Sequence, residues 1–254
     1  HQKEFENHKV SIILPNYNSA KYIISTLKSV INQSYKNWEL IIVDDCSDKI
    51  TKKILSRYKD IKKIKIIWLK KNKGAGYCRN LAIKKSKSDY LAFIDSDDLW
   101  EKNKLKIQLK FMVRNNYNFT CTNYKTINAA NEKLKEIDVA KKFNFKSFTK
   151  DTSIATSTMM VKRSVSKGIN FTSTKICEDY FYKCRILKKV KYAYSLENYL
   201  TKYRVRKDSL QSNKFLNFFW IWKINDKYNK FTLLENIQSL ICISLNSIKK
   251  YGFR

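Results

Sequence analysis

The chain of 254 residues is poor in several residue types. It contains two histidines, four glycines and one proline. Its six cysteines form neither a C-x-x-C motif nor a cluster with His1 or His8, so the sequence predicts no zinc site. No apolar run approaches the ~18 residues that cross a bilayer, and the polar N-terminal segment lacks a secretory signal. Together with the scattered cysteines, these features favour a cytoplasmic protein.

Acidic residues are scarce as well. The chain has 22 Asp and Glu against 52 Lys and Arg, a formal charge of +30. Such a charge makes DNA, RNA, anionic membranes and phosphorylated ligands candidate partners. The few glycines and prolines, beside abundant Lys, Asn, Ile and Tyr, point instead to a compositional drift that raises the Lys content everywhere. Both explanations of the charge stay open at this stage.

The hydrophobic content of 43% excludes a disordered chain and suits one to two folded domains. Short apolar runs predict strands at Val10–Leu14, Trp38–Val43, Ile64–Leu69 and Tyr90–Ile94. Between these strands we expect three helices. The first covers Ile23–Ile31 and is capped by Asn18 or Ser19, and the third covers Arg79–Lys85. The second is capped by Ser47, and its inward side chains are Ile50, Ile54, Leu55 and Tyr58. This alternation predicts an α/β fold, a mostly parallel sheet with helices on both faces.

Polar clusters follow three of these strands directly. They are Pro15-Asn16-Tyr17-Asn18, Asp44-Asp45-Cys46-Ser47 and Asp95-Ser96-Asp97-Asp98. Because ligands of such sheets bind outside the carboxyl ends of the strands, we expect all three clusters to form one site.

The acidic residues of this edge suit a cation. Asp95, Asp97 and Asp98 place three carboxylates within four residues, and Mg²⁺ or Mn²⁺ would relieve their repulsion. The alternative is that Asp97 or Asp98 caps a helix that begins near Trp100. Neither a phosphate-cradling G-x-x-x-x-G-K-[ST] loop nor a G-x-G-x-x-G motif is present.

Three other side chains suit a nucleoside diphosphate. Asp45 can accept a hydrogen bond from a base N–H, and Tyr17 can stack on a base, unless it is simply an exposed loop tyrosine. Arg79, early in its helix, can clamp a diphosphate, unless it is one more surface arginine.

The motifs VSIILPNYN, WELIIVDDCSD, NKGAGYCRN and YLAFIDSDDLW, in this order and spacing, resemble the family 2 glycosyltransferases with the GT-A fold. ICEDYFYKCRIL at 176–187 is similar to the family's Glu-Asp motif, and KYRVRKDSLQS at 202–212 to its usual tail element. The resemblance is strong over residues 9–112, thinner over 150–212 and absent beyond 213.

The resemblance implies a role for each matched residue. Pro15, Asn16, Tyr17 and Asp45 would hold the nucleoside, usually uridine, with Asp44 supporting the turn and Arg79 near the diphosphate or sugar. Asp95, Ser96 and Asp97 would form the D-x-D motif, with Asp97 as the direct ligand of Mn²⁺ or Mg²⁺ and Asp98 assisting. Asp179 would be the catalytic base, with Glu178 beside it.

The activity implied is inverting, metal-dependent transfer of a hexose or N-acetylhexosamine from a UDP-sugar. The acceptor would be a hydroxyl of a growing bacterial surface glycan, such as O-antigen, capsule or lipooligosaccharide, in free or lipid-linked form. Nucleotidyl transfer and nucleic-acid binding are the alternatives. The acidic clusters would oppose a polyanion at this edge, so no specific nucleic-acid partner is expected.

We expect a catalytic domain over residues 1–212, with a nucleotide-sugar half at 9–112 and an acceptor half at 113–212. In the latter we expect a few short β segments, among them Phe119–Thr122 and Ser157–Val161; a helix over 101–116 precedes it. A basic, aromatic-rich tail at 213–254 should form two helices joined near Asp226–Lys230. Such a tail suits an anionic membrane surface, peripherally on the inner face of the cytoplasmic membrane. It suits equally a subdomain packed on the catalytic domain or a dimer contact.

Overall fold

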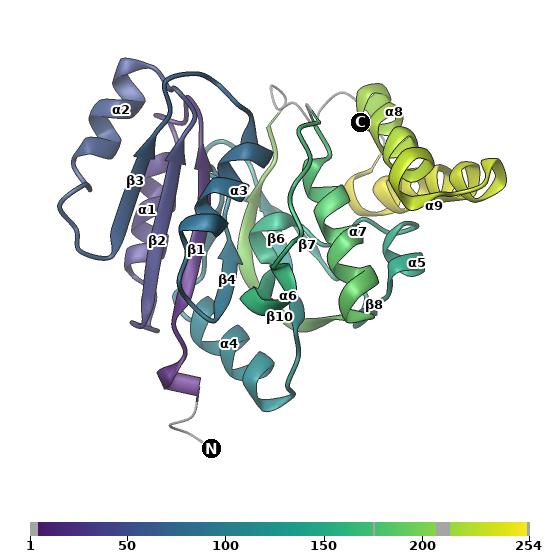
Figure 1. Cartoon of the computed structure of the whole chain (residues 1–254), viewed down its shortest axis with the longest axis horizontal. Helices are drawn as coiled ribbons and strands as arrows, with labels where there is room; N and C mark the ends of the chain where they lie inside the picture. The colour runs from purple at the N-terminus through teal and green to yellow at the C-terminus, as the bar shows by residue number, and fades with distance from the viewer. Residues whose placement is uncertain (1–4, 175, 207–213, 253–254) are drawn as a thin grey trace.

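The computed structural model describes residues 5–174, 176–206 and 214–252. In these residues, ten strands form one sheet in the order β3-β2-β1-β4-β9-β6-β10-β5, with β7 paired to β6 and β8 to β10 (Figure 1). The strands are β1 (Val10–Asn16), β2 (Trp38–Asp44), β3 (Ile64–Trp68), β4 (Tyr90–Phe93), β5 (Leu99–Trp100), β6 (Phe119–Ile127), β7 (Lys133–Ile137), β8 (Lys142–Phe143), β9 (Met160–Lys162) and β10 (Ala193–Arg204).

Strands β3, β2, β1 and β4 are parallel neighbours, as predicted. The second half joins the same sheet through β9, which is antiparallel to both β4 and β6, and β10 then runs parallel to β6. The fold is therefore α/β with a mostly parallel central sheet. Residues 9–112 and 113–204 share this sheet, and the proposed division near residue 212 stays a prediction because residues 207–213 lie outside the described ranges.

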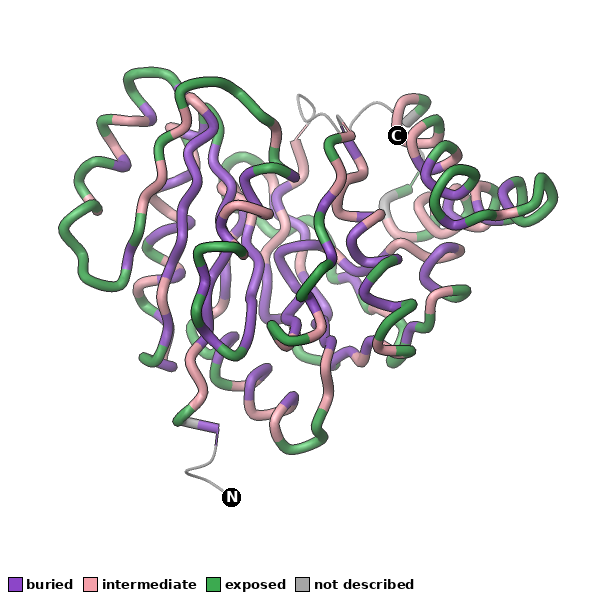
Figure 2. Tube along the Cα trace, viewed as in Figure 1, coloured by how far each residue is buried: buried purple, intermediate pink, exposed green. Residues whose placement is uncertain are grey.

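Helices cover both faces of the sheet. They are α1 (Ile23–Ile31), α2 (Lys49–Ser56), α3 (Ala75–Lys85), α4 (Lys104–Arg114), α5 (Phe145–Phe148), α6 (Arg163–Ser166), α7 (Glu178–Val190), α8 (Lys214–Ile224) and α9 (Leu233–Tyr251). One buried cluster joins the sheet to α1, α2 and α4, and a second joins it to α3 and α7. Figure 2 shows the strands as the buried centre of the molecule. Burial on both faces explains why the central strands are apolar without alternation.

The predicted inward faces are confirmed for α1 and α4, where Leu27, Val30, Leu105, Leu109 and Met112 are fully buried. Ile50 of α2, however, is 67% exposed, so its predicted inward position is wrong. The segment Ser157–Val161 is also not one strand. It begins in a 3₁₀ turn (Thr156–Thr158), and β9 starts only at Met160.

The predicted helix caps are wrong for a common reason: the side chains are engaged elsewhere. The Ser47 hydroxyl accepts the Asn18 amide at 2.9 Å, and Asp48 caps α2 instead by accepting the Thr51 amide at 2.7 Å. Helix α1 has Tyr22 at its N-cap without a side-chain bond, because the Ser19 hydroxyl donates to Asn16. Helix α3 begins at Ala75, four residues before Arg79.

The tail forms two helices, as predicted. A π-helical turn at Asn225–Asn229 joins α8 to the segment before α9, so the joint lies where the sequence predicts it. Both helices lie at the end of the molecule opposite α2 and β3 (Figure 1). The tail element predicted at 202–212 falls largely outside the described residues.

Candidate active site

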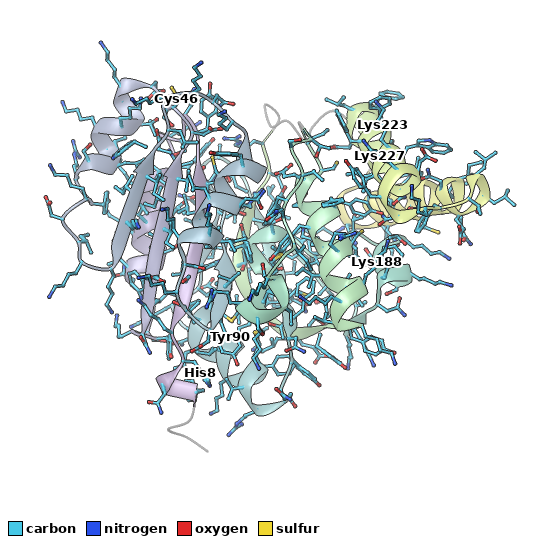
Figure 3. All side chains as sticks on the ribbon, viewed as in Figure 1. His8, Cys46, Tyr90, Lys188, Lys223 and Lys227 are labelled. Atoms are coloured by element: carbon cyan, nitrogen blue, oxygen red, sulfur yellow. The ribbon has the colours of Figure 1, made fainter. Side chains whose placement is uncertain are left out.

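The predicted site lies at the carboxyl ends of the parallel strands. Figure 3 shows Cys46, just after β2, at this edge, whereas His8 and Tyr90, at the start of β1 and β4, lie at the opposite edge. The three polar clusters therefore share one edge of the sheet, as the sequence predicts.

Asn16 and Asp44 are buried and bind each other. The Asn16 Nδ2 donates to Asp44 Oδ1 at 2.8 Å, and the Ser47 amide donates to Asp44 Oδ2 at 3.1 Å. Asp44 thus fixes the turn after β2, in keeping with its expected supporting role. The Asn16 amide group is engaged in the same network, so its side chain also fixes this turn. Pro15 is buried in β1, and Tyr17 is 53% exposed at the rim.

The Asp45 carboxylate organises the glycine loop that leads into α3. It accepts the Lys73 amide at 2.6 Å on Oδ1 and the Gly74 amide at 2.8 Å on Oδ2. Gly74 has a φ of +88°, a conformation that favours glycine, and it stands at the N-cap of α3. Asp45 is buried, and it positions the start of this helix; its predicted contact with a base stays a prediction.

Arg79 is buried between two carboxylates. Its Nη2 lies 2.7 Å from Asp95 Oδ1, after β4, and its Nη1 lies 2.6 Å from Glu178 Oε1, the first residue of α7. Through these two charged hydrogen bonds, Arg79 joins Asp95 to Glu178, which are 83 residues apart in the sequence. Arg79 is therefore not a surface arginine; it lies between two carboxylates, and its predicted contact with a diphosphate or sugar stays a prediction.

Asp97 and Asp98 point to different environments. Asp97 is partly exposed, and its Oδ2 lies 3.3 Å from Arg206 Nε. Its partial burial and the negative charge of Asp95 raise the pKa of Asp97 to about 6. Asp98 is fully buried, with the Ser157 hydroxyl donating to Oδ2 and the Arg204 amide donating to Oδ1 at 2.8 Å. Since both oxygens of Asp98 hold the fold together, its expected assistance to a metal is not supported. The Ser96 carbonyl accepts the Thr26 hydroxyl at 3.1 Å.

Asp179 is held by two donors that the sequence analysis missed. Lys183 Nζ lies 2.7 Å from Asp179 Oδ2, and the Thr156 hydroxyl donates to the same oxygen at 2.8 Å. Although burial favours the neutral acid, the Lys183 ammonium and its hydrogen bond hold the pKa of Asp179 well below its usual range. The i, i+4 spacing on a helix was the available signal for Lys183. Thr156 lies in a distant loop and carried none.

A cavity of about 1320 Å³ connects these groups to the tail. Asp95, Asp179 and Lys183 are among its lining residues. Apolar side chains from α8 and α9 line it too, among them Phe218, Ile221 and Ile243. The proposed catalytic carboxylate therefore shares one hollow with the C-terminal helices, which an amphiphilic molecule could fill.

A family model, Glycosyl transferase family 2, matches residues 11–169. The chain belongs to this family. It is 32% identical over 249 residues to the Escherichia coli UDP-Glc:alpha-D-GlcNAc-diphosphoundecaprenol beta-1,3-glucosyltransferase WfgD, a match that covers 98% of this chain and 97% of WfgD. The chain is a glycosyltransferase, the activity that the resemblance implies.

Solved structures confirm that this glycosyltransferase has the GT-A fold. Residues 1–349 of Staphylococcus aureus TarS in complex with UDP-GlcNAc match with a TM-score of 0.73 and 22% identity, covering 95% of this chain and 73% of that one. The mannosyltransferase PcManGT from Pyrobaculum calidifontis, in complex with GDP-Man and Mn²⁺, matches with a TM-score of 0.69 and 14% identity, covering 97% and 72%. At these identities the likeness concerns the fold alone.

Within the described ranges, no helix of this glycosyltransferase is both long and apolar enough to cross a membrane. Among the same residues, no three acidic, His or Cys side chains are grouped so that they could hold a metal by themselves.

Proposed function

We propose that the protein is an inverting, metal-dependent glycosyltransferase that moves a hexose or N-acetylhexosamine from a UDP-sugar to a hydroxyl of a growing, lipid-linked surface glycan. The observation that carries the proposal is the buried chain of charges Asp95–Arg79–Glu178 beside Asp179. It brings the end of β4, α3 and α7 together at the edge where such sheets bind nucleotides.

The metal requirement is supported by the donor set at the end of β4. Asp95 and Asp97 offer carboxylate oxygens, the ligands that Mg²⁺ and Mn²⁺ prefer, and partial burial together with the neighbouring Asp95 charge raises the pKa of Asp97. These two residues would hold the cation, which when bound offsets charge on a leaving diphosphate. The mannosyltransferase that shares the fold was solved with Mn²⁺ and a nucleotide sugar.

The chain's own residues supply the base. Asp179, kept ionised by Lys183 and Thr156, accepts the proton of the acceptor hydroxyl as that oxygen forms a bond to the anomeric carbon. The bond between this carbon and the diphosphate oxygen breaks on the opposite face, and the electron pair leaves with the nucleoside diphosphate. A single displacement of this kind inverts the anomeric configuration.

The donor and acceptor classes rest on the names of similar proteins. WfgD is named for a UDP-Glc donor and a diphosphoundecaprenol-linked acceptor, and the TarS structure contains UDP-GlcNAc. A diphosphoundecaprenol-linked acceptor is held in a membrane by its lipid. We therefore infer that this enzyme works peripherally, at the inner face of the cytoplasmic membrane.

Replacing the proposed base tests this function. We expect Asp179→Asn to lower turnover of UDP-sugars about 10³-fold, within the range that general-base catalysis contributes, while UDP with Mn²⁺ still raises the melting temperature. The panel of donors would include UDP-glucose, UDP-galactose and their N-acetyl forms. Asp60→Asn, an exposed substitution on the loop before β3, is the matched control and should keep full activity.

Two results would contradict the proposal. Unchanged turnover in Asp179→Asn would show that Asp179 is not the catalytic base. If UDP with Mn²⁺ did not raise the melting temperature of the folded protein, the proposal of a UDP-sugar donor would be contradicted.

A further inference from the structure

Helix α9 directs its polar side chains toward the protein. Asn236 Oδ1 and Ser239 Oγ accept from Asn225 Nδ2 at 3.2 and 3.1 Å, and all three residues are buried. Ser239 donates to the Thr149 carbonyl, and Asn246 donates to the Lys150 carbonyl at 3.0 Å. The inner face of α9 is thus attached to the catalytic domain by these hydrogen bonds and by the apolar packing of Leu240 and Ile243. The sequence alternative of a subdomain packed on the catalytic domain accounts for this face.

The outer face of α9 is apolar. Leu234, Ile237, Ile241 and Leu245 are 78%, 40%, 54% and 62% exposed. Their spacing of three, four and four residues places them in one stripe along the helix. A helix on the surface of a globular protein normally has one apolar stripe, which faces the core; α9 has this outer stripe in addition to Leu240 and Ile243, which pack inward. Because a contiguous exposed stripe of this kind marks an interaction site, α9 needs an occupant for its outer face.

Helix α8 adds aromatic and basic groups to the same end of the molecule. Phe215 and Phe219, one helical turn apart, are exposed. Lys223 Nζ lies 4.4 Å from the centre of the Phe219 ring, and Lys223 and Lys227 both belong to this end of the molecule (Figure 3). Exposed Lys230 and Lys249 flank α9. Aromatic rings, aliphatic side chains and lysines are the composition of a helix that lies in a membrane interface.

We propose that the outer stripe of α9, with the exposed rings and lysines of α8, docks on an anionic lipid bilayer. Charge selects this occupant. Two copies of a chain with a formal charge of +30 repel each other, whereas an anionic leaflet attracts the flanking lysines. This surface would hold the enzyme at the membrane location inferred above, and docking through it does not depend on sugar transfer.

Docking through this face has a consequence for the acceptor, which rests on the proposed function. Helices α8 and α9 also line the cavity that contains Asp179. A lipid-linked acceptor could therefore keep its lipid in the bilayer and place its sugar in the cavity without leaving the surface.

Vesicle flotation tests the docking surface. We expect the full chain to float with vesicles of phosphatidylcholine and phosphatidylglycerol in equal parts, and to bind pure phosphatidylcholine or high-salt samples far more weakly. Ile241→Ser with Leu245→Ser should weaken binding about tenfold or more, since two large apolar side chains no longer enter the lipid. The matched control is Ile50→Ser with Ile61→Ser, which removes two exposed isoleucines from the far end of the molecule.

The outcomes separate the occupants. Equal flotation of all three proteins, or no flotation of the unchanged chain, overturns the proposal. So does a dimer in sedimentation that the α9 variant abolishes while flotation is unaffected, because the occupant is then a second copy. Leu234→Gln with Ile237→Gln serves as a second variant if the first unfolds. Loss of sugar transfer alone does not bear on this result.

Discussion

Among the single residues, Lys183 defines the state of the proposed base. A carboxylate that must accept a proton at neutral pH has to be ionised beforehand. Burial works against ionisation of Asp179, and the buried Lys183 ammonium at 2.7 Å reverses that effect. Lys183 is thus a positioning residue, which acts on the acceptor through the charge and orientation of Asp179.

Removing the ammonium should make the enzyme more sensitive to acid. In Lys183→Met, burial is no longer opposed by this charge, so the pKa of Asp179 rises and the acid limb of the pH profile moves to higher pH. We expect the ratio of kcat/KM between the variant and the unchanged enzyme to be lower at pH 5 than at pH 8, because a larger share of Asp179 is protonated at the lower pH. Kinetics from pH 4.5 to 8 measure it.

The control is Lys189→Met, an exposed lysine on the same helix, which should leave the profile unchanged. A structural role alone would lower activity equally at all pH values. A constant ratio between pH 5 and pH 8 in Lys183→Met would therefore show that Lys183 does not set the ionisation of Asp179.

Lys104 is a buried cation with no carboxylate partner. Its Nζ is fully enclosed without a hydrogen bond and lies 3.9 Å from the centre of the Trp100 ring. Burial lowers the pKa of Lys104 far below its usual value, because the charged form loses its hydration. The folded state therefore binds fewer protons than the unfolded state over the range between the two pKa values, and stability rises with pH there.

Lys104→Met should stabilise the protein by roughly 1–3 kcal/mol at pH 7, because a buried amine is replaced by a side chain of similar length. The gain should grow as the pH falls and shrink toward pH 10, since the unfolded Lys104 is protonated below its own pKa. Urea unfolding at several pH values measures it. Lys106→Met, exposed on the same helix, should change stability by less than about 0.5 kcal/mol. A destabilised Lys104→Met would show that the contact with Trp100 outweighs burial.

The sequence placed the site residues at the correct edge but not the direction of each side chain. Asp98 follows the same strand as Asp97, yet it turns inward to Ser157 and Arg204 because those partners arrive from segments over 50 residues away. Asp45 lies at the predicted edge, and it accepts two amides of the loop before α3 that the sequence did not indicate. Position after a strand is a local property, whereas these hydrogen-bond partners are set by the tertiary fold.

Among the secondary-structure elements, α3 packs tightly at Gly76 against the start of α7 and the loop before it. A Cβ atom added there would lie 2.5 Å from the Thr172 carbonyl oxygen and 3.1 Å from Cγ of Glu178. The first contact is to backbone and cannot be relieved by a rotamer change. Glycine is therefore required for the close packing that lets Arg79 reach Glu178.

Gly76→Ala should lower the free energy of unfolding by roughly 1–3 kcal/mol, the usual cost of overpacking, and should reduce turnover because Glu178 shifts with α7. Chemical unfolding and the sugar-transfer assay measure the two effects. Gly168→Ala is the comparison, since its added Cβ meets nothing within 4 Å and only its φ of +79° resists the change. Wild-type stability and turnover in Gly76→Ala would contradict the close approach.

The elements of the first hundred residues could be predicted because their pattern is local: an apolar run, a polar turn and an amphipathic helix. The second half could not be predicted in the same way. Strand β9 has three residues and lies antiparallel between β4 and β6, and β10 pairs with β6 through two register shifts. Such pairings depend on contacts between distant segments. Ile50 has the helical spacing that predicts an inward side chain, yet it faces solvent, because the tertiary fold decides which residues of a helix are covered.

For the whole molecule, the excess of positive charge has a cost and a use. A formal charge of +30 on one folded chain repels itself, and this repulsion is weaker in the expanded, unfolded state. The same charge attracts an anionic surface over a Debye length. Screening by salt must therefore act in opposite directions on folding and on docking.

We expect the melting temperature to rise when NaCl increases from 20 to 300 mM, by about 2–4 °C for each kcal/mol of repulsion that screening removes. A scan near pH 9.8, the isoelectric point from the sequence, is the control, because the salt response should vanish where the net charge does. A melting temperature that falls with salt at pH 7 would mean that ion pairs such as Arg79 with Asp95 outweigh the repulsion. In that case the excess of Lys and Arg would not lower the stability of the fold.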